Sequence, residues 1–232
     1  YRVKHFKNDL LYPAFLTMLG FGLILLQPDF GSGIVMVCSI VVIVLAADSP
    51  VKYFVRIGML GAAGLGGLIL SAPYRLARIT SFINPWQDPL GAGFQIIQSL
   101  FAISPGGILG VGFDQSMQKH FYLPEPQTDF IFAIFAEEFG FIGCVLLITL
   151  FLLVIYEGMK IALNCADAYL CYVAIGLTSL FAIQVMINLG VVVGLFPVTG
   201  ITLPFISYGG SSLLVMMGSM GLLMSIANHA QK

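Results

Sequence analysis

Long apolar stretches separated by short polar segments dominate the sequence. A helix needs about 20 apolar residues, in a range of roughly 17 to 25, to cross a bilayer. Six stretches approach this length: Leu10–Leu26, Phe30–Ala47, Tyr53–Ala72, Phe130–Tyr156, Ala168–Gly190 and Ser211–Ala227. The pattern predicts an all-α integral membrane protein, a polytopic helical bundle with about six spans, in which residues 1–232 form a single membrane domain.

Two segments depart from this pattern. Residues 73–129 are polar and too long to be a simple turn, and they predict a long loop outside the membrane. Residues 191–210 are apolar but interrupted by Pro and Gly. Irregular backbone at membrane depth must be buried in protein or line a wet cavity. We interpret 191–210 as a candidate re-entrant segment, with an ordinary outer loop as the equal alternative.

Composition supports a membrane protein. The chain is 59% hydrophobic and only 9% charged, whereas soluble domains carry roughly 25% charged residues. Its net charge of −1 gives no reason to expect a nucleic-acid partner. The 4 cysteines contain no CxxC pair, so they are interpreted as small buried hydrophobes and not as a disulfide or metal framework.

Basic residues predict the orientation, because Lys and Arg concentrate on the cytoplasmic side. If both ends of the chain are cytoplasmic, the inside segments hold Arg2, Lys4, Lys7, Lys52, Arg56, Lys160 and Lys232. The outside segments then hold only Arg75, Arg78 and Lys119. This bias favours both ends inside, with the 73–129 loop facing outward.

The outer loop holds most of the candidate chemistry. Arg75 and Arg78 are three residues apart, so they share a helical face and could hold a lipid phosphate; interfacial anchoring is the alternative. Residues 94–101 predict a short amphipathic helix. Its glutamines, Gln95 and Gln98, could hydrogen-bond a sugar, although a solvated polar face is the more common outcome.

Three acids stand out further along. Asp129 directly precedes a predicted span, where it could cap the helix or serve as a partly desolvated general base. Residue chemistry alone favours the cap. Glu137 and Glu138 lie inside the span, where acids are costly and usually face a protein interior or a wet cavity. We therefore give them a structural or cavity role.

Several strings occur together in an order that resembles one known family. They are QPDFG at 27–31, NPWQDP at 84–89, GFQIIQSL at 93–100, YLPEPQTDFIF at 122–132, AEEFG at 136–140 and ITLPFISYGGSS at 201–212. The chain resembles the SEDS family (shape, elongation, division and sporulation), nearest its FtsW/SpoVE branch and also RodA-like. Family members have about ten spans, and this chain matches the last six, so we interpret it as the C-terminal part of such a protein.

The resemblance implies a peptidoglycan glycosyltransferase that polymerises lipid II on the outer face of the bacterial cytoplasmic membrane during cell division or sporulation. It implies inversion at the sugar, with Asp129 as the catalytic base. Arg75, Arg78 and Lys119 would bind the pyrophosphate, with Mg²⁺ as a candidate cofactor, and Gln98, Ser99 and Glu125 would bind sugars. Implied partners are lipid II, a class B penicillin-binding protein and other divisome membrane proteins. A lipid II flippase and a non-catalytic divisome scaffold remain alternatives.

Overall fold

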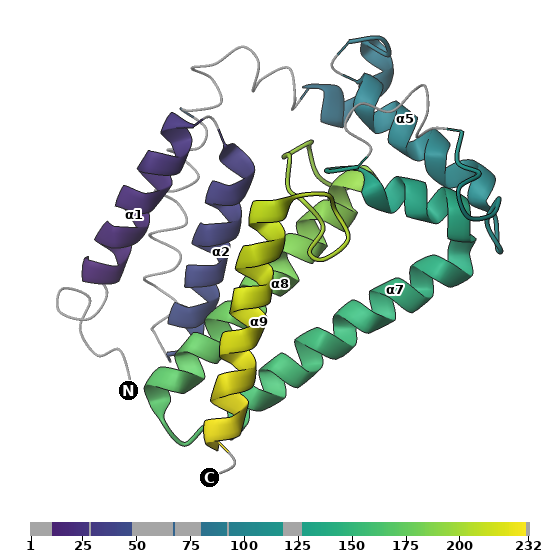
Figure 1. The fold of residues 1–232 in the computed structure, drawn as a ribbon. Coiled ribbons are helices and arrows are strands. Elements are labelled where there is room, and N and C mark those ends of the chain that lie inside the picture. Colours follow the sequence, from purple (N-terminus) through teal and green to yellow (C-terminus); the bar gives the residue numbers. More distant parts are fainter. Residues whose placement is uncertain are drawn as a thin grey trace. The chain divides into compact units, whose positions relative to one another are not determined.

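All regular secondary structure in the described residues is helical; these residues are 11–27, 29–47, 67, 80–91, 93–117 and 127–230 of a computed structural model (Figure 1). The elements are α1 (Leu11–Leu26), α2 (Phe30–Ala46), η2 (Pro85–Gln87), α5 (Phe94–Ile103), η3 (Ser104–Gly106), α7 (Ile131–Asn164), α8 (Ala168–Val192) and α9 (Gly210–Ala230). Within these residues, α7, α8 and α9 are long and apolar enough to cross a membrane. The predicted all-α membrane fold is confirmed, and the expected span at 53–72 lies outside the described residues.

Two compact units make up the chain, and each is described by itself. The first contains Tyr1–Gly67, Val154–Ile183 and Leu214–Lys232. The second contains Leu68–Leu153 and Gln184–Leu213. The outer loop and the interrupted segment predicted from the sequence therefore both belong to the second unit.

In the first unit, α1 and α2 form a hairpin of adjacent helices (Figure 1). The Asp29 side chain caps α2 by accepting a hydrogen bond of 3.0 Å from the Ser32 amide, which satisfies one of the free N–H groups of the first turn. Gly33 on α2 lies against the Phe21 ring of α1, so closely that a Cβ atom would overlap the ring. Small residues allow this kind of close approach between membrane helices.

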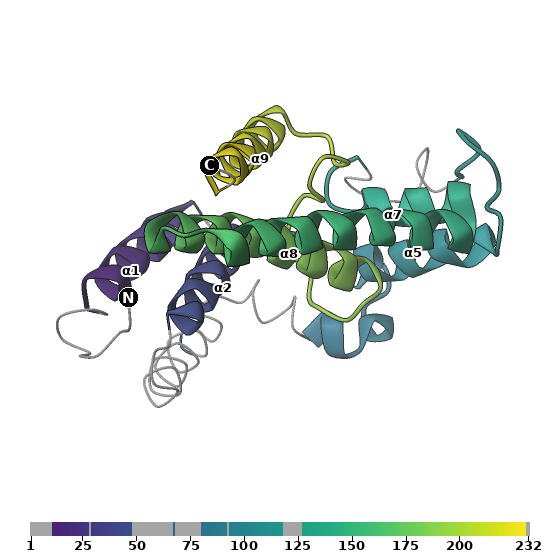
Figure 2. The same ribbon diagram turned by 90° about the horizontal axis from the view of Figure 1, so that it is seen from below.

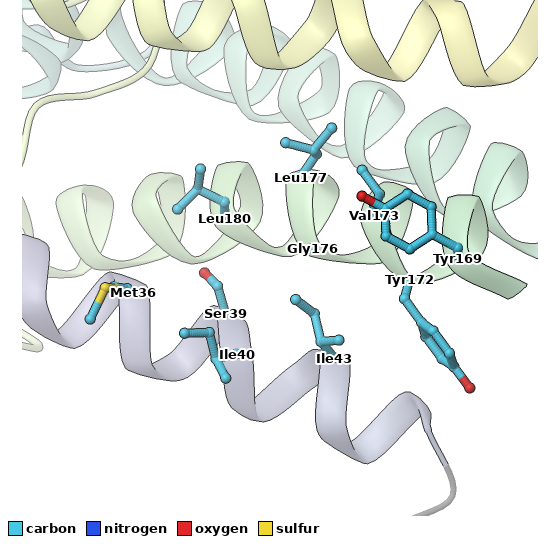
Figure 3. Close-up of a pocket in the computed structure, with 10 residues that line it drawn as sticks. All are labelled: Met36, Ser39, Ile40, Ile43, Tyr169, Tyr172, Val173, Gly176, Leu177 and Leu180. Carbon is cyan, nitrogen blue, oxygen red and sulfur yellow. The ribbon is translucent and has the colours of Figure 1, made fainter. Parts of the chain in front are cut away.

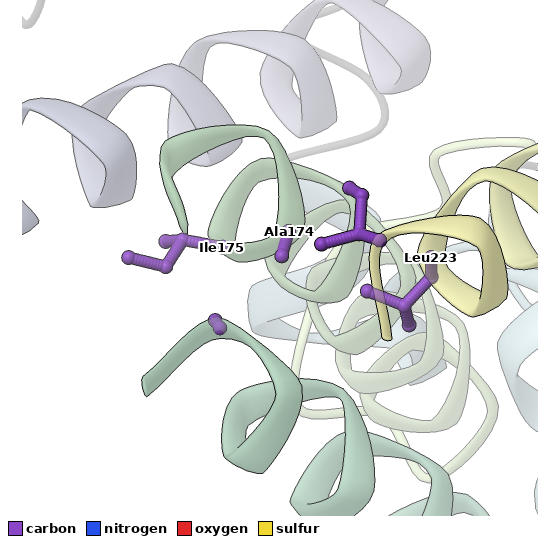
Figure 4. Close-up of a cluster of buried hydrophobic side chains, with 5 residues drawn as sticks. Ala174, Ile175 and Leu223 are labelled. Atoms are coloured by element: carbon purple, nitrogen blue, oxygen red, sulfur yellow. The ribbon is translucent and has the colours of Figure 1, made fainter. Parts of the chain in front are cut away.

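Three helices share the buried core of the first unit (Figure 4). Small and branched apolar side chains meet there: Ala162 of α7, Ala174 and Ile175 of α8, and Leu223 and Ile226 of α9. The alanines allow the helices to approach closely, while the larger side chains fill the remaining space.

An open hollow of about 430 Å³ lies between α2 and α8 in the same unit (Figure 3). It is lined by Met36, Ser39, Ile40 and Ile43 of α2 and by Tyr169, Tyr172, Val173, Gly176, Leu177 and Leu180 of α8. The hydroxyl of Ser39 donates to the Val35 carbonyl within its own helix. The described residues that line the hollow include no charged side chain, so the surface they offer is mainly apolar.

The second unit contains a sharp break in α7, which bends near its start (Figure 1). The break is at Gly140, whose φ of 64° and ψ of −164° are not helical. This backbone region is essentially restricted to glycine. The sequence predicted a span over Phe130–Tyr156, and the helix instead runs from Ile131 to Asn164 with this interruption.

The glycine-rich loop after η3 provides hydrogen-bond partners for the backbone groups of α7 that the break at Gly140 leaves unpaired within the helix. In a continuous helix the amides of Phe141 and Ile142 would donate to the carbonyls of Glu137 and Glu138. Here Phe141 and Ile142 donate instead to the loop carbonyls of Gly107 and Ile108, at 2.9 and 3.2 Å. The carbonyls of Glu137 and Glu138 accept instead from loop amides: the Val111 amide donates to the Glu137 carbonyl at 3.0 Å, and the Gly112 amide donates to the Glu138 carbonyl at 3.1 Å.

Helix α8 ends in a glycine turn and is followed by residues 193–209, which we call the connecting segment. The amide of Leu195 donates to the Gly190 carbonyl at 2.7 Å, and Gly194 has a φ of +75°. A left-handed glycine is a common way to end a helix. The connecting segment has no regular secondary structure and leads into α9 (Figure 2). It covers most of the predicted re-entrant range, but α8 includes residues 191 and 192.

Candidate functional site

Asp129 lies in the turn before α7, and its carboxylate faces the connecting segment. A Cβ atom placed on Gly200 would lie 3.7 Å from Asp129 Oδ2. Asp129 itself is half-buried. The carboxylate therefore sits against protein on one side and keeps some exposure on the other.

The α7 helix starts just after Asp129. The Phe130 carbonyl accepts from the amides of Ala133 at 2.9 Å and Ile134 at 3.5 Å, the first helical hydrogen bonds. Phe130 directly precedes α7, and its ring is completely buried. The helix cap predicted at Asp129, two residues before the first residue of α7, stays a prediction.

The backbone around Asp129 is held by hydrogen bonds from two sides. On one side, Asn188 Nδ2 of α8 donates to the Asp129 carbonyl at 2.9 Å and to the Ile201 carbonyl at 2.6 Å. On the other side, Ser207 Oγ donates to the Thr128 carbonyl at 2.5 Å and accepts from the Leu203 amide at 2.7 Å. These bonds fix the turn that carries Asp129 against the connecting segment.

Two further bonds reinforce the same contact. The amide of Tyr208 donates to the Gln127 carbonyl at 2.8 Å. Gln184, one turn before Asn188 on α8, donates through Nε2 to the Thr202 carbonyl at 3.1 Å. Irregular backbone inside a membrane protein needs such partners, because lipid offers none.

Glu137 ties the outer loop to α7. Its side chain is only 1% exposed. One carboxylate oxygen accepts from Ser116 Oγ at 2.5 Å, and the other accepts from the Met117 amide at 3.0 Å. A buried carboxylate needs hydrogen-bond donors of this kind. The structural role predicted for this acid therefore has a specific geometry, while Glu138 is buried beside it at 7% exposure.

Replacing Glu137 with Ala should loosen the loop. Ser116 and Met117 would lose their acceptor, which we expect to cost about 1–3 kcal/mol of local stability. Hydrogen exchange of the 110–117 peptide should become faster, and the rest of α7 should be unaffected. Glu157→Ala, at an exposed position of the same helix, is the matched control. Unchanged exchange in the Glu137 variant would contradict the tethering role.

The other predicted site residues are found in two situations. Arg75, Arg78, Lys119 and Glu125 lie outside the described residues. On α5, Gln98 is half-buried, whereas Ser99 is completely buried and donates to the Val192 carbonyl at 2.8 Å. In this structure the Ser99 hydroxyl joins α5 to the end of α8.

Two polar residues that hydrogen-bond the connecting segment to α8 are not among those predicted from the sequence. Gln184 and Asn188 lie four residues apart within an apolar span, so they share one face of the helix. Two amide side chains on the same face of a membrane helix indicate hydrogen bonds to a neighbouring segment. The four-residue spacing of Gln184 and Asn188 is therefore the sequence feature from which these hydrogen bonds could be predicted.

The described residues contain no group of three or more His, Cys, Asp or Glu side chains arranged to hold a metal ion. Asp129, Glu137 and Glu138 therefore do not form a protein-built magnesium site with one another.

Comparisons with known proteins agree on the family. The model of the cell cycle proteins FtsW, RodA and SpoVE matches residues 1–232. Over 229 residues, the chain is 52% identical to stage V sporulation protein E of Bacillus subtilis (strain 168), covering 99% of this chain and 63% of that protein. It is 40% identical over 229 residues to a probable peptidoglycan glycosyltransferase FtsW of Geobacter sp. (strain M18), covering 98% and 62%.

Solved structures give the same result. A structure of a peptidoglycan synthase complex that coordinates polymerization and crosslinking matches with a TM-score of 0.71 at 35% identity, over 95% of this chain and 62% of that one. The rod shape determining protein RodA of Thermus thermophilus matches with a TM-score of 0.64 at 29% identity, over 97% and 57%. The chain thus spans about three-fifths of the length of these relatives. The family resemblance in the sequence is confirmed: this chain belongs to the FtsW/RodA/SpoVE family of cell cycle proteins.

Proposed function

We propose that the protein carrying this chain is a peptidoglycan glycosyltransferase that polymerises lipid II during cell division or sporulation. The supporting observation is the placement of Asp129. Hydrogen bonds to Asp129 and Thr128 hold the turn on both sides, and the carboxylate faces Gly200. The relative named as a probable peptidoglycan glycosyltransferase FtsW supports the proposed activity, and the relative named stage V sporulation protein E supports a setting in sporulation.

In the proposed reaction, the growing glycan on undecaprenyl pyrophosphate is the donor, and the 4-hydroxyl of the GlcNAc of lipid II is the acceptor. The hydroxyl oxygen forms a bond to the anomeric carbon of the donor while the bond to the pyrophosphate oxygen breaks. Asp129 takes the proton of the hydroxyl, and undecaprenyl pyrophosphate leaves. Attack from the face opposite the leaving group inverts the anomeric centre.

Charge on the departing pyrophosphate must be offset, because cations placed where charge develops lower the barrier. We assign this task to Arg75, Arg78 and Lys119 of the outer loop. Gln98 and Glu125 would orient sugars. Ser99 would hold α5 against the end of α8 through its bond to the Val192 carbonyl. If Mg²⁺ takes part, the substrate phosphates are its natural ligands; none of the steps above depends on it.

The proposed setting is the bacterial cytoplasmic membrane, with both ends of this chain inside and the 73–129 loop outside. Residues 1–232 would form one membrane domain of a longer protein, with the connecting segment re-entering it beside Asp129. A class B penicillin-binding protein would cross-link the strands, and other divisome membrane proteins would assemble with it.

Polymerisation of purified lipid II by the full-length protein with its partner tests this function. We expect glycan strands that lysozyme digests. Transport of labelled lipid II across vesicles without polymer would support the flippase alternative, and neither activity would support the scaffold. Buried acids within a span, Glu137 and Glu138, would suit a flippase, and the hydrogen bonds of Glu137 to Ser116 and Met117 provide a structural reason for one of them.

A further inference from the structure

The side-chain amide of Asn188 is completely committed to two backbone carbonyls. Both partners, Asp129 O and Ile201 O, are acceptors, so the nitrogen of the amide must face them. The two hydrogens of that nitrogen are therefore both used. Asn188 is 1% exposed, which excludes bulk water from these bonds.

The other end of the same amide has no partner. Among the described residues, Asn188 Oδ1 is a buried oxygen without a hydrogen bond. A buried acceptor without a donor destabilises the folded state. A leucine of similar volume would avoid that penalty, but it would leave the Asp129 and Ile201 carbonyls without their donor. The benefit of asparagine at this position therefore lies in the two bonds that it donates.

One of those bonds acts directly on the backbone of Asp129. Fixing the Asp129 carbonyl restricts the rotation of its peptide unit and so the direction of its Cα–Cβ bond. The second bond fixes the Ile201 carbonyl, next to Gly200, which the Asp129 carboxylate faces. The Asn188 amide thus fixes the backbone of Asp129 and also the backbone next to Gly200, which the Asp129 carboxylate faces.

We propose that Asn188 is a positioning residue for Asp129, holding its carboxylate at the height and angle needed to take the acceptor proton. The proposal rests on the function proposed above, in which Asp129 is the base. Displacement of a reacting group by about 1 Å can cost on the order of 100-fold in rate. Asn188 would therefore affect turnover while leaving the binding of substrate nearly unchanged.

The fold has other bonds that hold the same segments together. Ser207 joins Thr128 to Leu203, Tyr208 joins Gln127, and Gln184 joins Thr202. None of these bonds is made to Asp129. Loss of the Asn188 amide should therefore leave the connecting segment in place but leave the Asp129 peptide less restricted.

The test compares Asn188→Leu with Gln184→Leu in the full-length protein with its partner. Gln184 is one turn away on the same helix and donates the same kind of bond to the same segment, but its acceptor is the Thr202 carbonyl and not that of Asp129. We expect Asn188→Leu to lower kcat by about 10- to 100-fold with KM for lipid II within about threefold of wild type. Gln184→Leu should change kcat by less than about threefold.

The same comparison in an Asp129→Asn background separates positioning from a general structural effect. If Asn188 acts through Asp129, Asn188→Leu should cause almost no additional loss there. A further loss as large as in wild type, or equal losses from both leucine variants, would overturn the proposal. Failure of both Asn188→Leu and Asn188→Ala to fold would also overturn it, because Asn188 would then be required by the fold itself.

These outcomes are distinct from failure of the proposed function. Normal polymerisation by Asp129→Asn alone would remove the base assignment on which the proposal rests. An inactive Asp129→Asn variant together with a fully active Asn188→Leu variant would leave the base in place and reject only the role of Asn188.

Discussion

Asp129→Asn is expected to lower glycan polymerisation by about 10²- to 10⁴-fold, the usual contribution of a general base. The amide has nearly the same size and can keep hydrogen bonds as an acceptor, but it cannot take the proton from the attacking hydroxyl. The backbone bonds from Asn188 and Ser207 do not involve the side chain of residue 129. The turn should therefore keep its geometry, and lipid II binding should remain close to normal.

The matched control is Asp114→Asn. Asp114 is an exposed acid of the outer loop with a φ of 65°, and asparagine tolerates this left-handed region as well as aspartate does. We expect polymerisation close to wild type, measured as the rate of lipid II consumption. Equal losses from the two substitutions would indicate that net loop charge matters, and normal activity of Asp129→Asn would rule out the catalytic base.

Local rules were sufficient to predict the helices from the sequence. The apolar stretches at Phe30–Ala47 and Ala168–Gly190 became α2 and α8 with ends displaced by one or two residues. Asp29, directly before the first of these stretches, caps α2. Lipid contact demands continuous internal hydrogen bonding, so a long apolar run has few alternatives to a helix.

The features that hold the candidate site were harder to predict, because they depend on contacts between residues distant in sequence. Ser116 donates to Glu137 across 21 positions, and Asn188 donates to Asp129 across 59. Nothing in the local pattern around Glu137 indicates that Ser116 and Met117 are its hydrogen-bond partners. Asp129 itself could be located by sequence, but only the family resemblance favoured a base over a helix cap.

The glycine run illustrates the same limit. The glycines at 106, 107, 110 and 112 permit a flexible backbone and close approach of another segment, but the sequence does not name that segment. In the structure the approach is to the broken part of α7: a Cβ on Gly106 would overlap the Ala136 carbonyl, and one on Gly110 would overlap the Glu138 carbonyl. The break in α7 and the composition of the loop are therefore two halves of one arrangement.

Gly140→Ala is accordingly expected to disrupt this arrangement. The backbone at Gly140 is in a region nearly exclusive to glycine, and an alanine there adds strain of about 1–3 kcal/mol. The new Cβ would also overlap the Gly110 amide nitrogen and lie 2.8 Å from the Gly106 oxygen, and such overpacking costs about 1–3 kcal/mol more. Together these effects should lower the unfolding midpoint of the purified protein by roughly 5–20 °C.

The alanine variant has one alternative conformation, and it leads to the same result at the loop. If α7 straightens, the amides of Phe141 and Ile142 donate again to the Glu137 and Glu138 carbonyls. The loop then loses its four backbone hydrogen bonds to α7. Hydrogen exchange at Val111 and Gly112 should then become fast. Gly221→Ala on α9, where a Cβ meets nothing within 4 Å, is the control and should be neutral or stabilising by up to about 1 kcal/mol. An unchanged midpoint together with unchanged exchange in Gly140→Ala would show that the loop does not depend on the break in α7.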